Sequence, residues 1–213
     1  LSFQQRGPGD IFNITFRDIR IETRYDSPRW WGNGEWVAIT SEPRNPGDIV
    51  GRAYDLVFEN ITAVSENGGL LSGRAHGVTN LTMRHIDITI KAFSNYSDGS
   101  GPLCSFVLKD GNYHSATVPM LCMGSRDYRP SYRQGDDPFC ITRGACRTPS
   151  VADGLYLENV RAGVLEDVKV TFDGPRRLWY GDCLVQGRGS KDIRQRGLQC
   201  INGPAGEKLI QSR

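Results

Sequence analysis

The sequence lacks several features that would place it in a familiar class. It has no apolar run of about 18 residues, the length that a membrane-spanning helix requires, and no convincing amphipathic helical period. A dominant charge is also missing, because 26 Lys and Arg face 24 Asp and Glu. Nucleic-acid-binding proteins usually carry a basic stripe, and none is visible here. We therefore expect no helical bundle, no membrane span and no nucleic-acid partner.

The cysteines lack the C-x-x-C spacing of zinc ribbons and thioredoxin-like redox sites. Their even number fits the disulfide framework of a secreted protein, and pairing in sequence order would close the shortest loops. This interpretation joins Cys104 to Cys122, Cys140 to Cys146, and Cys183 to Cys200. Buried free thiols in a cytosolic protein are the alternative.

Sequons for N-glycosylation are more frequent than chance predicts. With 10 Asn in the chain, chance gives about one N-x-S/T sequon, and four are present. They start at Asn13, Asn60, Asn80 and Asn95. Glycosylation of a secreted or cell-wall protein is one interpretation. The other is that Asn occupies a fixed structural position in a repeat.

A short pattern recurs along the chain. Apolar and polar residues alternate and usually end in Asp or Asn followed by Ile or Val. Copies start at Asn13, Asp55, Asn80, Gly154, Ala162 and Asp192. Alternation with a period of two indicates strands rather than helices, and the Asp or Asn is expected to bend each strand.

The spacing of the copies predicts the architecture. Asp55 and Asn80 are 25 residues apart, and the longer intervals suggest the same unit with loop insertions at 22–54 and 92–152. Short strands at such a period are typical of a solenoid whose coils add strands to parallel sheets. We therefore predict an all-β fold, a right-handed parallel β-helix, with residues 1–213 as a single domain. Because the chain opens in mid-pattern, we expect it to be the C-terminal part of a longer protein.

Three segments carry a resemblance to a known family. Residues 21–35 read I-E-T-R-Y-D-S-P-R-W-W-G-N-G-E, and residues 65–73 read S-E-N-G-G-L-L-S-G. With the strand pattern they resemble the pectin-lyase-like β-helix superfamily, and more specifically the polygalacturonase-like glycoside hydrolases of family 28. Residues 127–130, D-Y-R-P, are similar to a further segment of that branch. The resemblance runs from residue 1 to about residue 172.

The resemblance implies inverting hydrolysis of a uronic-acid glycosidic bond by carboxylic acids on neighbouring coils. The family's motifs N-T-D, D-D, G-H-G and R-I-K follow one another along the chain. Here residues 1–5 occupy the R-I-K position, with Ser2 and Gln4 in place of its Arg and Lys. Asp136-Asp137 and His76 come after that position and are interpreted as loop residues. The catalytic acids are therefore expected upstream of residue 1, and this segment alone is expected to be inactive.

Several residues are candidates for a glycan site. An exposed aromatic ring can pack on the apolar face of a pyranose, and the candidates are Tyr25, Trp30, Trp31 and Trp36. Alternatively, the tryptophans clamp their own loop to the fold. Glu35, at the end of the W-W-G segment, and Glu66, in the S-E-N-G segment, are candidate catalytic carboxylates, with a bend or a salt bridge as the alternative. No metal site and no cofactor are implied.

Two functions stay open from the sequence. The first is the C-terminal portion of a secreted polygalacturonase-like hydrolase of acidic polysaccharide. The second is a non-catalytic, glycosylated β-helix that serves as a structural or glycan-binding component of an extracellular assembly. In both cases the strand edge at residue 1 would invite pairing, so we expect more chain or a partner subunit to cover it.

Overall fold

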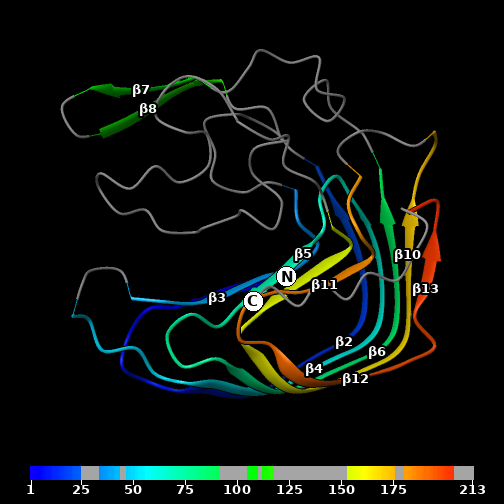
Figure 1. Cartoon of the computed structure of the whole chain (residues 1–213), viewed down its shortest axis with the longest axis horizontal. Coiled ribbons are helices and arrows are strands. Elements are labelled where there is room, and N and C mark those ends of the chain that lie inside the picture. The colour runs from blue at the N-terminus through cyan, green and yellow to red at the C-terminus, as the bar shows by residue number, and fades with distance from the viewer. Residues whose placement is uncertain are drawn as a thin grey trace.

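The computed structural model describes residues 1–24, 34–43, 47–91, 105–109, 112–117, 153–175 and 180–203. Within these residues the protein is all-β and contains no helix. Ten of the strands belong to two parallel sheets that face each other across a common core, and one more strand pairs with the second of them (Figure 1). The all-β expectation is confirmed.

The first sheet consists of five short strands in the order β1-β3-β5-β9-β11. All of its pairings are parallel. The strands are β1 (Ser2–Gln5), β3 (Ala38–Ser41), β5 (Gly69–Ser72), β9 (Leu155–Glu158) and β11 (Leu184–Gln186).

The second sheet is built mainly from long strands in the order β12-β10-β6-β4-β2, and β13 also pairs with β10. Its pairings are parallel as well. The strands are β2 (Ile11–Thr23), β4 (Ala53–Ser65), β6 (Val78–Ile90), β10 (Val160–Phe172), β12 (Lys191–Arg196) and β13 (Gln199–Ile201). A separate antiparallel pair is formed by β7 (Ser105–Lys109) and β8 (Asn112–Thr117).

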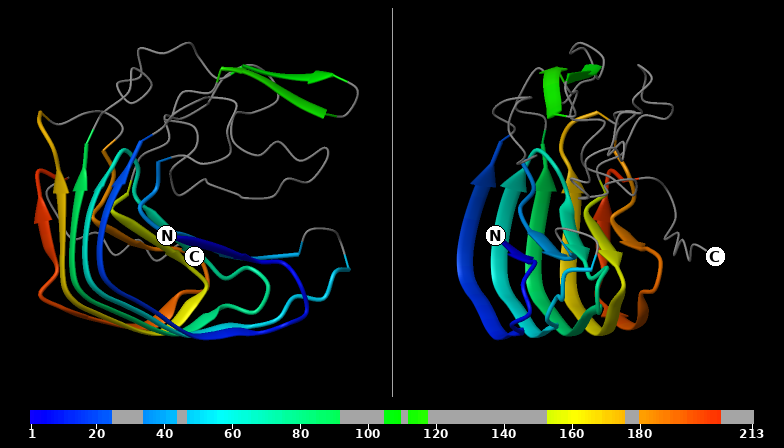
Figure 2. Two further views of the ribbon diagram at one scale, coloured as in Figure 1. Left: turned by 180° about the vertical axis from the view of Figure 1, so that it is seen from behind. Right: turned by 90° about the vertical axis from the view of Figure 1, so that its left-hand side faces the viewer.

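The chain visits the two parallel sheets in turn, so each first-sheet strand is followed by a second-sheet strand. We call each such pair a rung. Rungs 1 to 5 are β1–β2, β3–β4, β5–β6, β9–β10, and β11 with β12 and β13. Figure 2 shows the rungs side by side in chain order, from blue to orange. Equivalent residues of successive rungs therefore form rows that run along the stack.

Two of these rows bend the second sheet. In the first bend row, φ lies between 54° and 58° at Asn13, Asp55, Asn80, Ala162 and Asp192. In the second bend row, φ lies between 50° and 71° at Asp18, Asn60, His85, Asp167 and Gly197. Asn and Asp tolerate this left-handed region better than most residues, because their short polar side chains bond locally. The predicted bending by Asp and Asn is confirmed, and it stacks in register through the sheet.

The segment boundaries need three corrections. Residues 22–54 are not one loop insertion, because they contain β3 and the start of β4. The pattern copy at Gly154 leads into β9 of the first sheet, whereas the other five copies lie in the second. Within 92–152, the described backbone forms β7 and β8.

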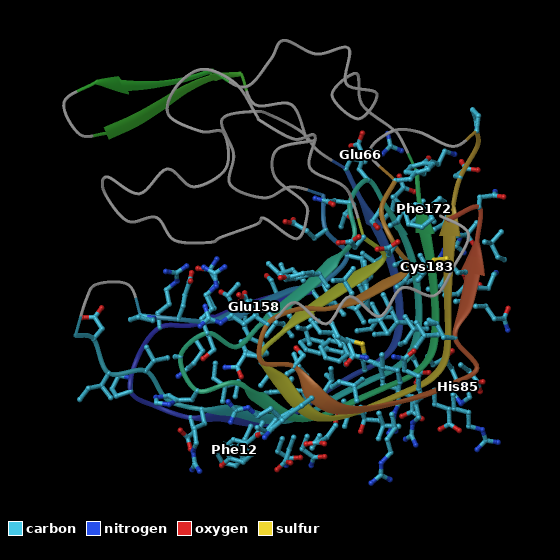
Figure 3. The ribbon with its side chains drawn as sticks, in the orientation of Figure 1. Phe12, Glu66, His85, Glu158, Phe172 and Cys183 are labelled. Atoms are coloured by element: carbon cyan, nitrogen blue, oxygen red, sulfur yellow. A yellow bond between two sulfur atoms is a disulfide. The ribbon has the colours of Figure 1, made fainter. Side chains whose placement is uncertain are left out.

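The core lies between the two sheets. The alternation of the long strands turns Leu56, Phe58 and Ile61 of β4 inward, and all three are buried. Figure 3 shows Phe172 and Cys183 between the sheets, whereas Phe12 and His85 lie on the outer face of the second sheet. Burying one large apolar side chain stabilises a fold by about 1.5–3 kcal/mol, so the repeated inward rows hold the rungs together.

A disulfide fastens the last rung. Cys183, just before β11, is bonded to Cys200 in β13. The predicted pairing of these two cysteines is confirmed. The other four cysteines lie outside the described residues.

Candidate functional site

Of the four predicted sugar-stacking residues, three lie outside the described residues: Tyr25, Trp30 and Trp31. The fourth, Trp36, is completely buried in the core. Its indole Nε1 donates a hydrogen bond to the carbonyl oxygen of Gly154, at 3.4 Å. A ring that water cannot reach offers no face to a sugar, so for Trp36 the stacking prediction is wrong, and its indole packs in the core instead.

The two candidate carboxylates lie near each other. Glu35 pairs through a parallel β-bridge with Asn67, the residue after Glu66. Glu66 is completely buried and Glu35 is half-buried, and each interacts with other groups of the protein. A buried carboxylate cannot protonate a glycosidic oxygen in a polymer that stays outside. The placement of Glu66 therefore favours a structural role over the predicted catalytic one.

A row of acids and amides runs along the stack just before the first-sheet strands. In rungs 2 to 5 it contains Glu35, Asn67, Asp153 and Asp182, as the strand register shows. Asn67 Oδ1 accepts the backbone N–H of Gly68 at 2.8 Å, and Asp153 Oδ1 accepts that of Asp182 at 2.9 Å. These side chains satisfy backbone donors where the chain turns from one sheet to the other.

Sequence analysis missed Asp153 and Asp182. Their signal was an acid or amide just before a first-sheet strand: Asn67, Asp153 and Asp182 each stand two residues before the first strand residue, and Glu35 stands three residues before it. Among the residues that the structure describes, no group of three or more His, Cys, Asp or Glu could hold a metal ion.

A charged network lies at the carboxyl ends of the first-sheet strands. Arg6 Nη2 lies 3.2 Å from Glu42 Oε1, and Arg74 Nε lies 3.0 Å from Glu158 Oε2. A longer contact of 3.9 Å joins Arg74 to Glu42, so the charges alternate along the stack. The carboxylates of Glu42 and Glu158 are thus committed to arginine. Figure 3 shows Glu158 well apart from Glu66.

The outer face of the first sheet carries a polar row next to this network. Gln4, Thr40, Ser72 and Glu158 lie in register. Ser72 Oγ donates to Glu158 Oε2 at 2.7 Å, and Gln4 Oε1 accepts from Arg6 Nε at 3.1 Å. Thr40 Oγ1 is buried without a hydrogen-bond partner. Hydroxyl, amide and carboxylate groups in one row could bind a polyhydroxylated ligand, but Thr40 and Ser72 are closed to solvent here.

The outer face of the second sheet carries a row of alternating charge, which we call the alternating row. Arg17, Glu59, Arg84, Glu166 and Arg196 lie in register on rungs 1 to 5. Glu59 lies 2.7 Å from Arg17 and 2.9 Å from Arg84. The nearby Arg84 and Arg17 side chains hold the pKa of Glu59 below its usual range, against a smaller opposing effect of desolvation.

Three of the four sequons start in the bend rows. Asn13, Asn60 and Asn80 are all exposed, and Asn95 lies outside the described residues. Asn60 Nδ2 donates to Asp18 Oδ1 at 2.6 Å, and Asn80 Nδ2 donates to Asp55 Oδ1. The nitrogen that a glycan would occupy is thus part of a contact between rungs in Asn60 and Asn80. The structural interpretation therefore accounts for both residues, and glycosylation stays a prediction.

Replacing Asn80 by aspartate is expected to lower the free energy of unfolding by about 1–2 kcal/mol, because it exchanges a hydrogen bond for two facing carboxylates. Aspartate keeps the left-handed backbone accessible, as Asp55 and Asp192 already adopt it. The loss should shrink in acid, because one carboxyl of a facing pair takes up a proton and the repulsion ends. Urea unfolding at pH 7 and pH 3.5 measures both effects, and a loss that does not depend on pH would contradict this account.

No protein-family model matches the sequence, and no curated protein or solved structure matches it either. The described part of the chain has no helix that is long and apolar enough to cross a membrane.

Proposed function

We propose that the chain is part of a right-handed parallel β-helix in a secreted polygalacturonase-like hydrolase of acidic polysaccharide. The catalytic acids lie on further rungs beyond β1 and β2. The alternation of the chain between two parallel sheets supports the helical path, and crossover connections between parallel strands are almost always right-handed. The W-W-G and S-E-N-G segments support the lineage.

The observation that carries this proposal is the apolar side of rung 1. Ile14, Phe16, Ile19 and Ile21 are only partly buried. The equivalent residues of rung 2, Leu56, Phe58, Ile61 and Ala63, are at most 1% exposed. An apolar row this long at the end of a stack is unfavourable in water, and a further rung would bury it as rung 1 buries rung 2.

The pairing of the first-sheet acids also supports catalysis on other rungs. An inverting glycosidase needs one carboxylic acid and one carboxylate, about 6.5–9.5 Å apart, with room for a water molecule. Glu42 and Glu158, the two acids at the carboxyl ends of described first-sheet strands, are bound by Arg6 and Arg74. The R-I-K position on β1 carries Ser2 and Gln4 instead.

We expect residues 1–213 alone to release no reducing sugar from polygalacturonate. A chain extended to its native N-terminus, found by peptide mass spectrometry, should release it. The extended chain with both Glu42 and Glu158 replaced by glutamine serves as a matched control, since it should keep turnover if the catalytic acids lie elsewhere. Robust turnover by residues 1–213 would contradict the proposal.

A second function is favoured by a separate observation. The outer face of the first sheet, the sheet that contains the R-I-K position on β1, is closed: Thr40, Leu70, Ser72 and Val185 are each at most 5% exposed. This supports a non-catalytic β-helix in an extracellular assembly. Binding of polygalacturonate by the extended chain without turnover would select this alternative.

A further inference from the structure

The edge of rung 1 has a definite charge pattern. Arg17 ends the alternating row there, and its side chain is 55% exposed although Glu59 pairs with it on one side. β2 is an edge strand, with β4 as its one partner in the second sheet. Because charges alternate along this row, we expect an acidic residue at the next position beyond Arg17, on a strand paired with the other edge of β2.

The hydrogen bonds of the bend rows have a direction. Asn80 on rung 3 donates to Asp55 on rung 2, and Asn60 on rung 2 donates to Asp18 on rung 1. Each asparagine thus donates toward the preceding rung. Asn13 holds the same position on rung 1 that Asn80 holds on rung 3, and β2 has no described strand on that side.

Aromatic stacking is a third feature of the β2 edge. Phe12 stacks on Tyr54 with ring centroids 5.1 Å apart, and Phe16 stacks on Phe58 at the same distance. Phe12 is nevertheless 52% exposed. One ring face is therefore covered by rung 2, and the other is available to an apolar or aromatic side chain from a further strand.

Two of these features, the charge and the asparagine donor, already meet their complement once in the molecule. On β6, Asn80 donates a hydrogen bond to Asp55 of β4, and Arg84 forms an ion pair with Glu59 of β4. β2 carries the same Asn-x-x-x-Arg spacing in Asn13 and Arg17. We propose that the occupant of the free β2 edge is a parallel strand like β4, with an acid opposite Arg17 and an Asp opposite Asn13. This inference depends on the proposed continuation of the stack beyond rung 1.

A second copy of this chain, stacked head to tail, fits this edge poorly. The last described rung of such a copy is rung 5, which would place Arg196 opposite Arg17 and Gln195 opposite Phe16. Two arginines repel, and an amide against an aromatic core position loses its hydrogen bonds to water. Of the rung 5 residues in these rows, Asp192 alone could accept the hydrogen bond that Asn13 of the next copy would donate. The edge therefore favours a strand that differs from those of rung 5, the last described rung.

The test uses the sequence of β4 as the probe. A labelled peptide of residues 53–65 is titrated with the full 213-residue chain and followed by fluorescence anisotropy. It should bind at least about fivefold more tightly than the same peptide with Glu59→Arg, as expected for one favourable against one repulsive exposed pair. The preference should fall with added salt. In the chain variant R17Q it should disappear, with circular dichroism confirming that the variant folds.

Two results would overturn the inference. The first is equal affinity for the two peptides, or no binding of either up to the limit of solubility. The second is a concentration-dependent series of oligomers of the chain alone in sedimentation velocity, which would show that a second copy occupies the edge. Neither result depends on polysaccharide turnover, so a failure here is distinguishable from a failure of the proposed hydrolase lineage.

Discussion

Replacing Gly68 by alanine is expected to unfold the stack between rungs 3 and 4. A Cβ at this position would lie 1.4 Å from the backbone oxygen of Asp153. The backbone cannot move aside cheaply, because the Gly69 N–H donates to the oxygen of Gly154 at 2.9 Å. We expect a loss of more than about 4 kcal/mol in the free energy of unfolding, at the extreme of single substitutions. Urea unfolding followed by circular dichroism measures this loss.

The matched control is Gly7→Ala. A Cβ on Gly7 would meet no atom within 4 Å, and its backbone does not occupy the left-handed region. This variant should stay within about 0.5 kcal/mol of the wild type. If Gly68→Ala behaved like Gly7→Ala, the close approach of rungs 3 and 4 at Gly68 and Asp153 would be wrong, together with the register of β5 on β9.

The second sheet was predictable because its residues alternate. One face of each long strand lies on the core and the other faces solvent, so polar and apolar residues follow a period of two. The bends were predictable for the same reason, since Asn and Asp recur at a fixed place in the pattern. His85 and Ala162 also bend the chain. They are neither Asn nor Asp, but they occupy the same register positions in the bend rows.

The first sheet was harder to predict. All four residues of β5 are buried, as are three of the four in β3. A short strand covered on both faces reads as a brief apolar or small-residue run, which periodicity cannot assign. This is why 22–54 was interpreted as a loop insertion, although it contributes β3 to the sheet.

The candidate site illustrates what a sequence leaves undetermined. Trp36 and Glu66 were selected because aromatic and acidic residues commonly bind sugars, but residue type does not reveal burial. The row of Asn67, Asp153 and Asp182 becomes visible only once the register of the first sheet is known. Pairing across rungs, as between Arg74 and Glu158, joins residues 84 apart and leaves no local trace.

Replacing both Cys183 and Cys200 by alanine is expected to lower the free energy of unfolding by about 3 kcal/mol. Their disulfide closes a loop with a sequence separation of 17, and opening a loop of that size restores about this much chain entropy to the unfolded state. The effect should be local, because rung 5 is the last rung of the described stack: β12 and β13 have β10 as their one described partner. Hydrogen exchange should therefore show lost protection at residues 184–201 and unchanged protection in β4 and β6, which have neighbours on both sides. A uniform loss of protection over all rungs would contradict this, and would mean that the disulfide stabilises the whole stack as one cooperative unit rather than fastening its last rung.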